Sequence, residues 1–220
     1  MTILSIETSG SVCGVALATL DGESYSLRTA IEVLIPNVHD GALARLAVQC
    51  MSEAGVGIVD IDVVAVSSGP GSFTGLRIGA SFAKGLCFTG SPRLLAVPTM
   101  QSVAAASTEV ATLAARSAII VVIPSHRDLV YLQRYDAHAM PLTDVAVMTI
   151  TKATEMCGPD TLVVGPGASL VSPAPVSGLG RCSPRFVSMA ASIMLRNSDV
   201  VYADPQTFEP GYRQEFVPKA

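Results

Sequence analysis

A glycine-rich turn between two apolar segments is the part of the chain whose residue types could do chemistry. It runs from Gly69 to Gly75 (GPGSFTG), after a strand-like run at 62–67 and before a proline-free segment at 76–88. Backbone amides in such a turn can line a concave surface, which suits a phosphate group or a rigid contact with another protein. The pattern alone leaves both uses open.

Two common phosphate-binding motifs do not fit this turn. A Walker A loop needs a Gly-Lys-Ser/Thr sequence, whereas the nearest following lysine, Lys84, lies two turns into the next helix. The dinucleotide-binding fingerprint does not match either. A phosphate, if one binds, must therefore be held by a different arrangement.

The composition predicts a globular protein without a strongly basic surface. Of 220 residues, 50% are hydrophobic and 15% are charged, which is enough for a core in one large domain or two small ones. The net charge is −4, from 14 Lys and Arg against 18 Asp and Glu. Proteins that hold a nucleic acid by themselves usually have a basic surface, because phosphate contacts supply much of the affinity. Tight binding of a nucleic acid by this chain alone is therefore not expected.

Neither a membrane segment nor a disulfide framework is expected. The richest apolar run, 118–123, has the length of a strand and ends at Pro124. The N-terminal apolar run has no basic region before it and contains Glu7, which argues against a secretory signal. Five scattered cysteines without a CxxC pair suit free thiols in a reducing compartment. We therefore expect a cytoplasmic protein.

The order of hydrophobic segments predicts an α/β protein. We expect strands at 2–7, 12–20 and 24–30, a helix at 37–54, a strand at 62–68, a helix at 75–89 and a strand at 93–97. A helix from 99 to about 115 leads to strands at 118–123, 129–135, 145–149 and 161–164, a short helix from 151, a segment at 165–184 that is mostly loop, and a helix near 188–197. Three strands followed by alternating helices and strands favour a mixed sheet covered on both faces.

The helices expected at 37–54 and 75–89 differ in pattern. The first has an apolar stripe of normal width, which predicts one buried face. In the second, only three residues between 76 and 88 are polar: Arg77, Ser81 and Lys84. A helix that is apolar almost all round needs cover on more than one side. That cover is either a second layer of its own domain or a partner subunit.

The long form of the turn, GPGSFTGLRIG at 69–79, resembles the TsaB (YeaZ) family, which acts in making threonylcarbamoyladenosine on tRNA. The segment ILSIETSGSVCGVALATL at 3–20 is similar to the family's opening hairpin, with its acidic-Thr-Ser turn. His39 before an amphipathic helix and the ending EPGYR at 209–213 also agree. This specific resemblance covers the first hundred residues and the last dozen.

The resemblance implies an actin-like (ribonuclease-H-like) fold of two related lobes, each with a mixed sheet flanked by helices. The first lobe is expected at 1–101 and a second, smaller lobe at 102–204. The tail at 205–220 is expected to return to the first lobe.

The resemblance also implies a non-catalytic scaffold subunit. Such a chain pairs with the catalytic paralogue TsaD and the ATPase TsaE, in the complex that puts threonylcarbamoyl on the adenosine next to the tRNA anticodon. We expect a homodimer when it is alone, and tRNA contact only through the complex. The paralogue's metal-binding HxxxH has no counterpart, because residues 99–103 read Thr-Met-Gln-Ser-Val and no two histidines have i, i+4 spacing. No catalytic residue and no metal are therefore expected.

The competing interpretation is an enzyme, an ATP-dependent small-molecule kinase or ATPase of the actin-like superfamily. Its phosphate site would combine the two turns: Glu7, Thr8, Ser9, Gly69, Gly71 and Ser72. The scaffold interpretation requires no cofactor and allows only weak ATP or ADP binding. For Glu7, a solvated acid in the hairpin turn is the alternative. A peptidase has no support, because no GxSxG elbow or metalloprotease helix surrounds any serine or cysteine.

In the family, the helices that correspond to 37–54 and 75–89 form the contact surface with a partner. The residues expected there are Val38, His39, Leu43, Leu46, Phe73, Thr74, Leu76, Arg77, Ile78, Ser81, Phe82 and Lys84. Some have plainer alternatives: His39 as a helix cap or surface residue, and Phe73 as a core side chain. Arg77 and Lys84 suit either a phosphate or acids across an interface.

The chain also departs from the family at two places. After the strand at 118–123 the family usually reads Asp-Ala-Arg, whereas this chain has Pro124, Ser125 and His126. Any role of that acid and arginine is therefore in doubt here. Gly211 stands where relatives often carry a larger residue, which loosens that contact.

Overall fold

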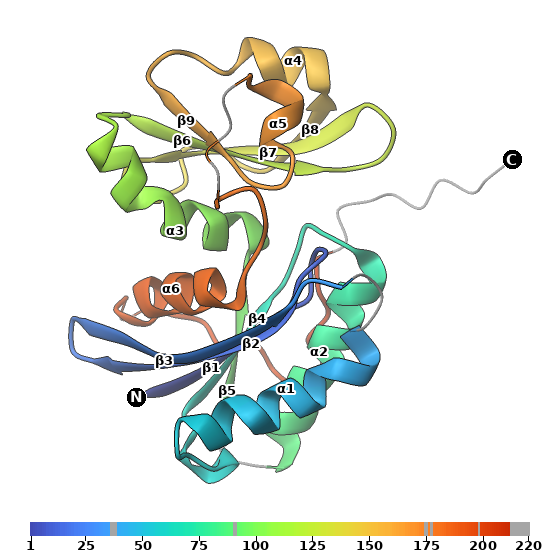
Figure 1. Cartoon of the computed structure of the whole chain (residues 1–220), viewed down its shortest axis with the longest axis vertical. Coiled ribbons are helices and arrows are strands. Elements are labelled where there is room, and N and C mark those ends of the chain that lie inside the picture. The colour runs from blue at the N-terminus through green and yellow to red at the C-terminus, as the bar shows by residue number, and fades with distance from the viewer. Residues whose placement is uncertain (36–38, 90–91, 174–175, 177, 198, 212–220) are drawn as a thin grey trace, which may run out of the picture.

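The computed structural model describes residues 1–35, 39–89, 92–173, 176, 178–197 and 199–211. These residues form two lobes, each built on a mixed sheet with helices beside it (Figure 1). The first sheet has the strand order β3-β2-β1-β4-β5, and the second has the order β8-β7-β6-β9. The expected α/β class, with two mixed sheets flanked by helices, is confirmed.

The first lobe contains β1 (Thr2–Glu7), β2 (Cys13–Asp21), β3 (Ser24–Val33), α1 (His39–Glu53), η1 (Ile58–Asp60), β4 (Val63–Ser67), α2 (Phe73–Thr89) and β5 (Arg93–Val97). β1 to β3 pair antiparallel, whereas β4 runs parallel to both β1 and β5. Because β1 and β4 are parallel neighbours, the turn after Glu7 and the turn after Ser67 leave the same edge of the sheet. The fold therefore brings the hairpin turn and the glycine-rich turn together.

The second lobe contains α3 (Thr99–Leu113), β6 (Ala118–Pro124), β7 (Leu129–Asp136), β8 (Ala146–Thr149), α4 (Ile150–Glu155), β9 (Thr161–Val164) and α5 (Ala168–Val171), and α6 (Pro184–Leu195) comes last. β6 pairs antiparallel with β7 and parallel with β9. α6 packs on α3 and on the strands of the first sheet, so these two helices lie between the sheets (Figure 1). α6 covers the first sheet although it follows the second sheet in sequence. The lobe boundaries at 101 and 204 stay a prediction.

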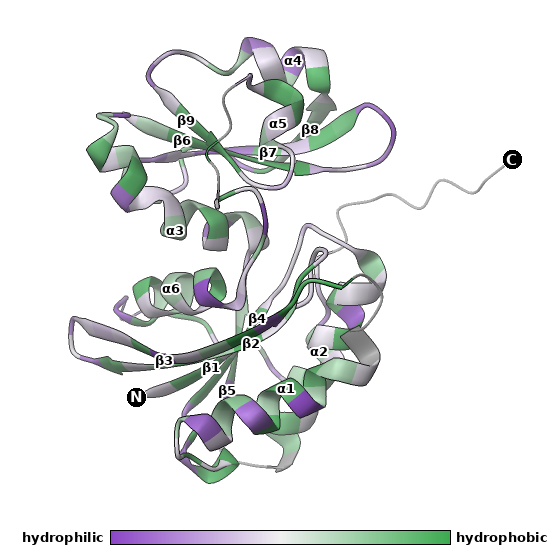
Figure 2. Cartoon of the chain, viewed as in Figure 1, coloured by the Kyte–Doolittle hydropathy of each residue, from purple (hydrophilic) through white to green (hydrophobic). Residues whose placement is uncertain are grey.

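Strand β1 is buried on both faces, because helices cover both sides of the first sheet. Leu4 and Ile6 pack in a cluster with α1 and α2, whereas Ile3 packs in a cluster with α3 and α6. Figure 2 shows mostly hydrophobic strands in this sheet and hydrophilic residues on the outer side of α1. The apolar stripe predicted for α1 is thus confirmed as its buried face.

Two helices differ from what we expected for the segment 165–184 and the helix that follows it. α6 begins at Pro184, four residues earlier than expected, because Ser183 caps it: its Oγ accepts from the amide of Arg185 at 3.2 Å. The four-residue helix α5 was not expected at all. In the part of the chain that the structure describes, no helix is long and apolar enough to cross a membrane.

The segment from Ala203 to Gly211 returns to the first lobe along the edge strand β5. The amide of Ala203 donates to the carbonyl of Leu94 at 2.9 Å, and the amide of Gly211 donates to the carbonyl of Ser68 at 2.8 Å. The second bond ties this segment to the start of the glycine-rich turn. Tyr212 and Arg213 of the EPGYR ending lie outside the described residues.

Candidate functional site

The glycine-rich turn and the start of α2 pack directly on the β1–β2 turn. A Cβ atom added to Gly71 would overlap the backbone of Ser9, and one added to Gly75 would overlap the carbonyl oxygen of Thr8. A Cβ atom at Gly79, one helical turn later, would overlap the Thr8 hydroxyl. These three glycines therefore allow the glycine-rich turn and α2 to approach the β1–β2 turn more closely than any side chain would permit.

Three backbone amides of the turn donate hydrogen bonds inside the protein. Gly69 N donates to Thr99 Oγ1 at 3.1 Å, and Ser72 N donates to the carbonyl of Ser9 at 2.7 Å. Gly75 N donates to Ser72 Oγ at 3.2 Å, so Ser72 caps the start of α2. An amide that bonds within the protein does not face a phosphate. The glycines are thus explained by packing, without a ligand.

Glu7, at the end of β1, is fully buried beside this contact. Its Oε1 accepts hydrogen bonds from the amide of Ser9 and, at 3.3 Å, from Ser67 Oγ. Its Oε2 has no hydrogen-bond partner among the described residues. Burial raises the pKa of this carboxyl to about 7, and hydrogen bonds from Ser9, Ser67 and Thr8 offset only part of that shift. The alternative of a solvated hairpin acid was therefore wrong.

A small hollow of about 210 Å³ lies in front of these two turns, between the lobes. The first lobe lines it with residues 9–10 and 70–72, and the second part of the chain with Ile123, Pro124, Pro166 and Cys182. Pro124, one of the residues that replace the family's Asp-Ala-Arg, thus forms part of its wall. Ser125 and His126 bond to each other at 3.3 Å beyond it. The six candidate phosphate residues lie around one edge of the sheet, and ATP or ADP binding there stays a prediction.

On α2, the residues open to solvent form one line along the helix: Thr74, Arg77, Ser81, Gly85 and Phe88. Phe73 begins the helix and is 49% exposed, and the Arg77 guanidinium stacks over its ring at 4.1 Å from the centroid. Phe73 is thus not a core side chain. Lys84 donates to the carbonyl of Phe208 at 3.1 Å, so it holds the returning C-terminal segment.

Several residues expected at a partner interface are core residues of this chain. Leu43 and Leu46 of α1 are buried in the cluster between α1, α2 and the sheet, and Leu76 is buried at the start of α2. Ile78 and Phe82 are half-buried against the same cluster. Leu43, Leu46 and Leu76 are therefore removed from the contact surface that we consider below. Val38 and the side chain of His39 lie outside what the structure describes.

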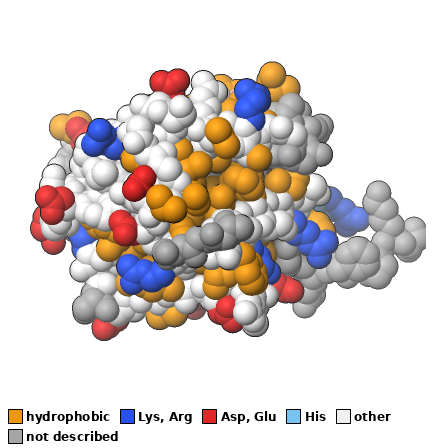
Figure 3. Space-filling view, turned by 90° about the horizontal axis from the view of Figure 1, so that it is seen from below, with side chains coloured by type: hydrophobic (Ala, Val, Ile, Leu, Met, Phe, Trp, Pro, Cys, Tyr) orange, Lys and Arg blue, Asp and Glu red, His pale blue; other side chains and the backbone are white. Residues whose placement is uncertain are grey.

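The exposed side of α1 carries small residues, one large apolar side chain and the polar residues Arg45, Gln49 and Glu53. Gly41, Ala44 and Ser52 are exposed, and Val48 is 64% exposed. α1 packs beside α2, whose exposed Phe88 lies 63% open. Figure 3 shows an area of hydrophobic side chains on the first lobe, seen from the end at which these helices lie. The helix pair thus offers a surface that combines small and apolar residues with a few charged ones.

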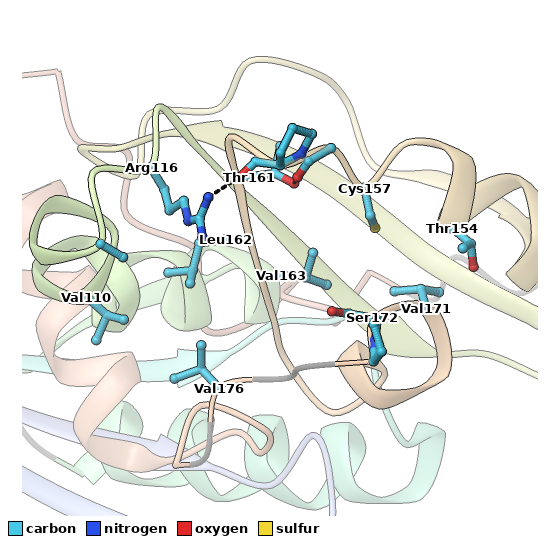
Figure 4. Close-up of a pocket in the computed structure, with 14 residues that line it drawn as sticks. Val110, Arg116, Thr154, Cys157, Thr161, Leu162, Val163, Val171, Ser172 and Val176 are labelled. Atoms are coloured by element: carbon cyan, nitrogen blue, oxygen red, sulfur yellow. Dashed lines mark hydrogen bonds between the residues drawn. The ribbon is translucent and has the colours of Figure 1, made fainter.

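A groove with a volume of about 510 Å³ lies in the second lobe (Figure 4). Its walls are mostly aliphatic, with Val110, Leu162 and Val176 among them. At one end, the Arg116 guanidinium donates to the carbonyl of Pro159. The described residues that line the groove include no Asp, Glu or His, so they offer no acid or base for catalysis.

Comparisons with known proteins identify the family of this chain. The family model for TsaD, tRNA N6-adenosine threonylcarbamoyltransferase, matches residues 35–192. This chain belongs to the TsaD family. Within the family, TsaB of Haemophilus influenzae is 32% identical over 109 residues, and TsaB of Escherichia coli is 34% identical over 104 residues. These matches cover 50% and 47% of this chain but only 44% and 43% of the two relatives.

Solved structures extend the likeness to the whole fold of this TsaD-family chain. YeaZ from Pseudomonas aeruginosa has a TM-score of 0.75 at 24% identity, over 96% of this chain and 99% of that one. A second structure, titled as an uncharacterised protein with similarity to peptidase YeaZ from the same organism, has a TM-score of 0.76 at 24% identity, over 97% and 99% of the two chains. The predicted actin-like fold class and the resemblance to TsaB (YeaZ) are confirmed.

The sequence did not reveal which residues surround Glu7 in this TsaD-family fold. Ser67 stands at the end of a strand just before the turn, so its position was a usable signal. Cys182 and Pro184 come from more than 170 residues away, and their segment carries no motif. Only the packing of α6 on the first sheet places them there.

Proposed function

We propose that this chain is a non-catalytic scaffold subunit for making threonylcarbamoyladenosine on tRNA. In this proposal it pairs with a TsaD-type paralogue, which carries the chemistry, and allows a TsaE-type ATPase to bind. The transfer of threonylcarbamoyl to the adenosine next to the anticodon takes place on the paralogue. The protein acts in the cytoplasm, needs no cofactor or metal of its own, and binds ATP or ADP weakly if at all.

The packing at the start of α3 carries the non-catalytic part of the proposal. The resemblance implies a metal-binding HxxxH there in the catalytic paralogue, but this chain has Thr99, Met100, Gln101, Ser102 and Val103. Thr99 Oγ1 accepts from Gly69 N, and Ser102 Oγ donates to the carbonyl of Thr99 at 2.7 Å. Met100 and Val103 are fully buried in the core. Hydroxyls used within the fold and apolar side chains are poor ligands for a transition metal.

The exposed side of the α1–α2 pair supports the pairing part. Small residues at Gly41, Ala44, Ser81 and Gly85 allow another helix to approach closely, while Val48 and Phe88 supply apolar area. Interfaces of this kind have an apolar core of low charge within a polar rim. We therefore place the partner contact on this side, with Thr74 and Arg77 at its border and Ile78 and Phe82 as support beneath it.

The charge balance supports contact with tRNA through the partner. The 14 basic residues are scattered along the sequence and are outnumbered by 18 acidic residues, which gives a net charge of −4. Neutralising several phosphates requires several converging Lys or Arg side chains. A subunit with that property must hold the tRNA in this proposal.

The experiment is a mixing test with the purified TsaD-type paralogue from the same cell. Light scattering during size exclusion should show a complex of the two chains, and the chain alone should show neither ATP turnover nor tight ATP binding. Absence of a complex in all conditions, with ATP turnover by this chain alone, would favour the small-molecule kinase or ATPase. A complex together with turnover by the chain alone would contradict the non-catalytic part only.

A further inference from the structure

The carboxyl of Glu7 lies at a junction of segments from both parts of the chain. Glu7 pairs with Gly14 across β1 and β2, and a Cβ atom at Gly14 would lie 2.8 Å from Pro184 Cγ. The first turn of α6 therefore presses on the sheet beside Glu7. Cys182, two residues before α6, lines the hollow between the lobes together with Ser9. Ser9 is in turn bonded to Glu7 through its amide.

Among the described residues, no basic group neutralises this carboxyl. The causes that set its pKa are burial and hydrogen bonds from Ser9, Ser67 and Thr8, and no charged side chain is among them. On α6, Arg185 pairs with Glu32 of β3 at 3.4 Å rather than with Glu7. The described residues that line the hollow carry no Lys, Arg, His, Asp or Glu. An ionised Glu7 in this closed arrangement is thus a buried anion with one oxygen that has no partner.

The two titratable neighbours of Glu7 do not change charge near neutral pH. Burial, followed by the charge of Glu7, raises the pKa of Cys13 on β2 to about 11. The same two causes also raise the pKa of the Cys182 thiol. Both thiols therefore stay protonated, and Glu7 is the group of this cluster that titrates.

We propose that Glu7 is a proton-operated latch on the junction between the lobes. With its proton, Glu7 allows residues 182–184 to close over the β1–β2 turn, as the structure has them. When Glu7 ionises, its unpartnered oxygen requires water, and the 210 Å³ hollow that Ser9 and Cys182 line offers space for it beside this turn. Residues 182–184 and the β1–β2 turn then open locally while both sheets stay folded.

Hydrogen exchange of the full chain, read by mass spectrometry at pH 5.5 and 8.5, tests the latch. After correction for the intrinsic exchange rate, protection of peptides that cover 8–13 and 179–187 should fall at least tenfold at the higher pH. Peptides from α1 and from β6 and β7 report global opening, and their protection should fall less. In Glu7→Gln, which cannot ionise, the two junction peptides should stay protected at both pH values.

Glu32→Gln is the matched control, because Glu32 anchors the same helix start. Its Oε1 accepts from Ser183 Oγ at 2.6 Å and pairs with Arg185. This variant should weaken protection of 179–187 by a similar factor at both pH values. The latch is contradicted if protection of the junction peptides in the wild type does not change with pH. It is also contradicted if this protection falls in Glu7→Gln as it does in the wild type, or if Glu32→Gln removes the pH dependence.

Carbon-13 NMR of the wild type tests the same proposal without the variant, in case Glu7→Gln does not fold. The carboxyl carbon of Glu7 should titrate with a midpoint near 7, and the amide of Cys182 should shift with the same midpoint. A midpoint below about 5, or an amide of Cys182 that does not respond, overturns the proposal.

Discussion

Gly75 of α2 lies directly under the carbonyl oxygen of Thr8, with no room for a side chain between them. This contact joins the glycine-rich turn to the β1–β2 turn at the edge where β1 and β4 end. A phosphate cradle requires free amides in an open loop, whereas this turn is closed by the chain itself. The contact therefore explains the glycine spacing without a ligand.

Gly75→Ala should destabilise the protein, because the new methyl group has to push the β1–β2 turn away from α2. Overpacking of this kind costs about 1–3 kcal/mol or more. Gly85→Ala is the matched control in the same helix, since a Cβ atom there meets open space. It should be neutral or stabilising by up to about 1 kcal/mol. Urea unfolding of both variants measures the difference, and equal stabilities would show that the turns do not need this contact.

Glu7→Gln should remove a pH dependence of stability. The pKa of Glu7 is raised from 4.5 to about 7 in the folded state, so the folded chain binds the proton more tightly than the unfolded chain does. This stabilisation is complete below pH 4.5 and is lost as the pH rises through 7. The shift corresponds to about 3 kcal/mol.

Unfolding free energies at pH 5 and pH 8 measure this effect. Through Glu7, the wild type should lose most of that roughly 3 kcal/mol between pH 5 and pH 8. Glu7→Gln should not show this loss. At pH 8 the variant should therefore be the more stable protein. A wild type that is equally stable at both pH values, with the same result for the variant, contradicts the burial of an uncompensated carboxyl.

Ser81→Glu should prevent pairing through the α1–α2 side and leave the fold intact. Ser81 is exposed in the line of solvent-facing residues on α2. A carboxylate placed in a desolvated contact without a partner costs several kcal/mol, enough to abolish a micromolar complex. Ser26→Glu, at an exposed position on β3, is the control and should pair normally.

Size exclusion with light scattering measures pairing, and circular dichroism checks the fold. If Ser81→Glu pairs like the wild type, the interface lies elsewhere. If it unfolds, Ser81 supports the core of its own chain, contrary to its exposure.

Isolated protein should bind tRNA weakly, with a dissociation constant above about a micromolar at about 0.15 M salt, because too few basic groups converge. Its affinity should fall further as salt rises. Filter binding with unmodified tRNA from the same cell measures this. Sub-micromolar affinity at that salt concentration would reveal a basic surface formed by residues distant in sequence.

The sequence predicted the order of elements because most carry clear hydrophobic periods and turn residues. The helix α2 shows where this reasoning stops. Its nearly all-apolar composition left two explanations open, and the structure shows that one side packs on the sheet while Ile78 and Phe82 are half-buried beside α1. Periodicity cannot separate a second internal contact from an external one, because both favour apolar residues.

The environment of Glu7 was beyond sequence reasoning for a different reason. A single acid after a strand is usually solvated, and the neighbouring Thr8 and Ser9 suggested a polar turn. Its burial comes from α6, which crosses back from the second lobe to cover the first sheet. Long-range packing of this kind leaves no local pattern. The early start of α6 was missed although Ser183 and Pro184 are ordinary start signals.

A reconstituted modification assay tests the central claim most directly. Unmodified tRNA, ATP, threonine and bicarbonate are supplied with the enzyme that makes threonylcarbamoyl-adenylate, and modified nucleoside is measured by mass spectrometry after digestion. The TsaD-type and TsaE-type partners should modify the tRNA only when this chain is added, and this chain without the TsaD-type partner should give no product. Product formed by this chain without that partner, or full activity of the partners without this chain, would contradict a scaffold role.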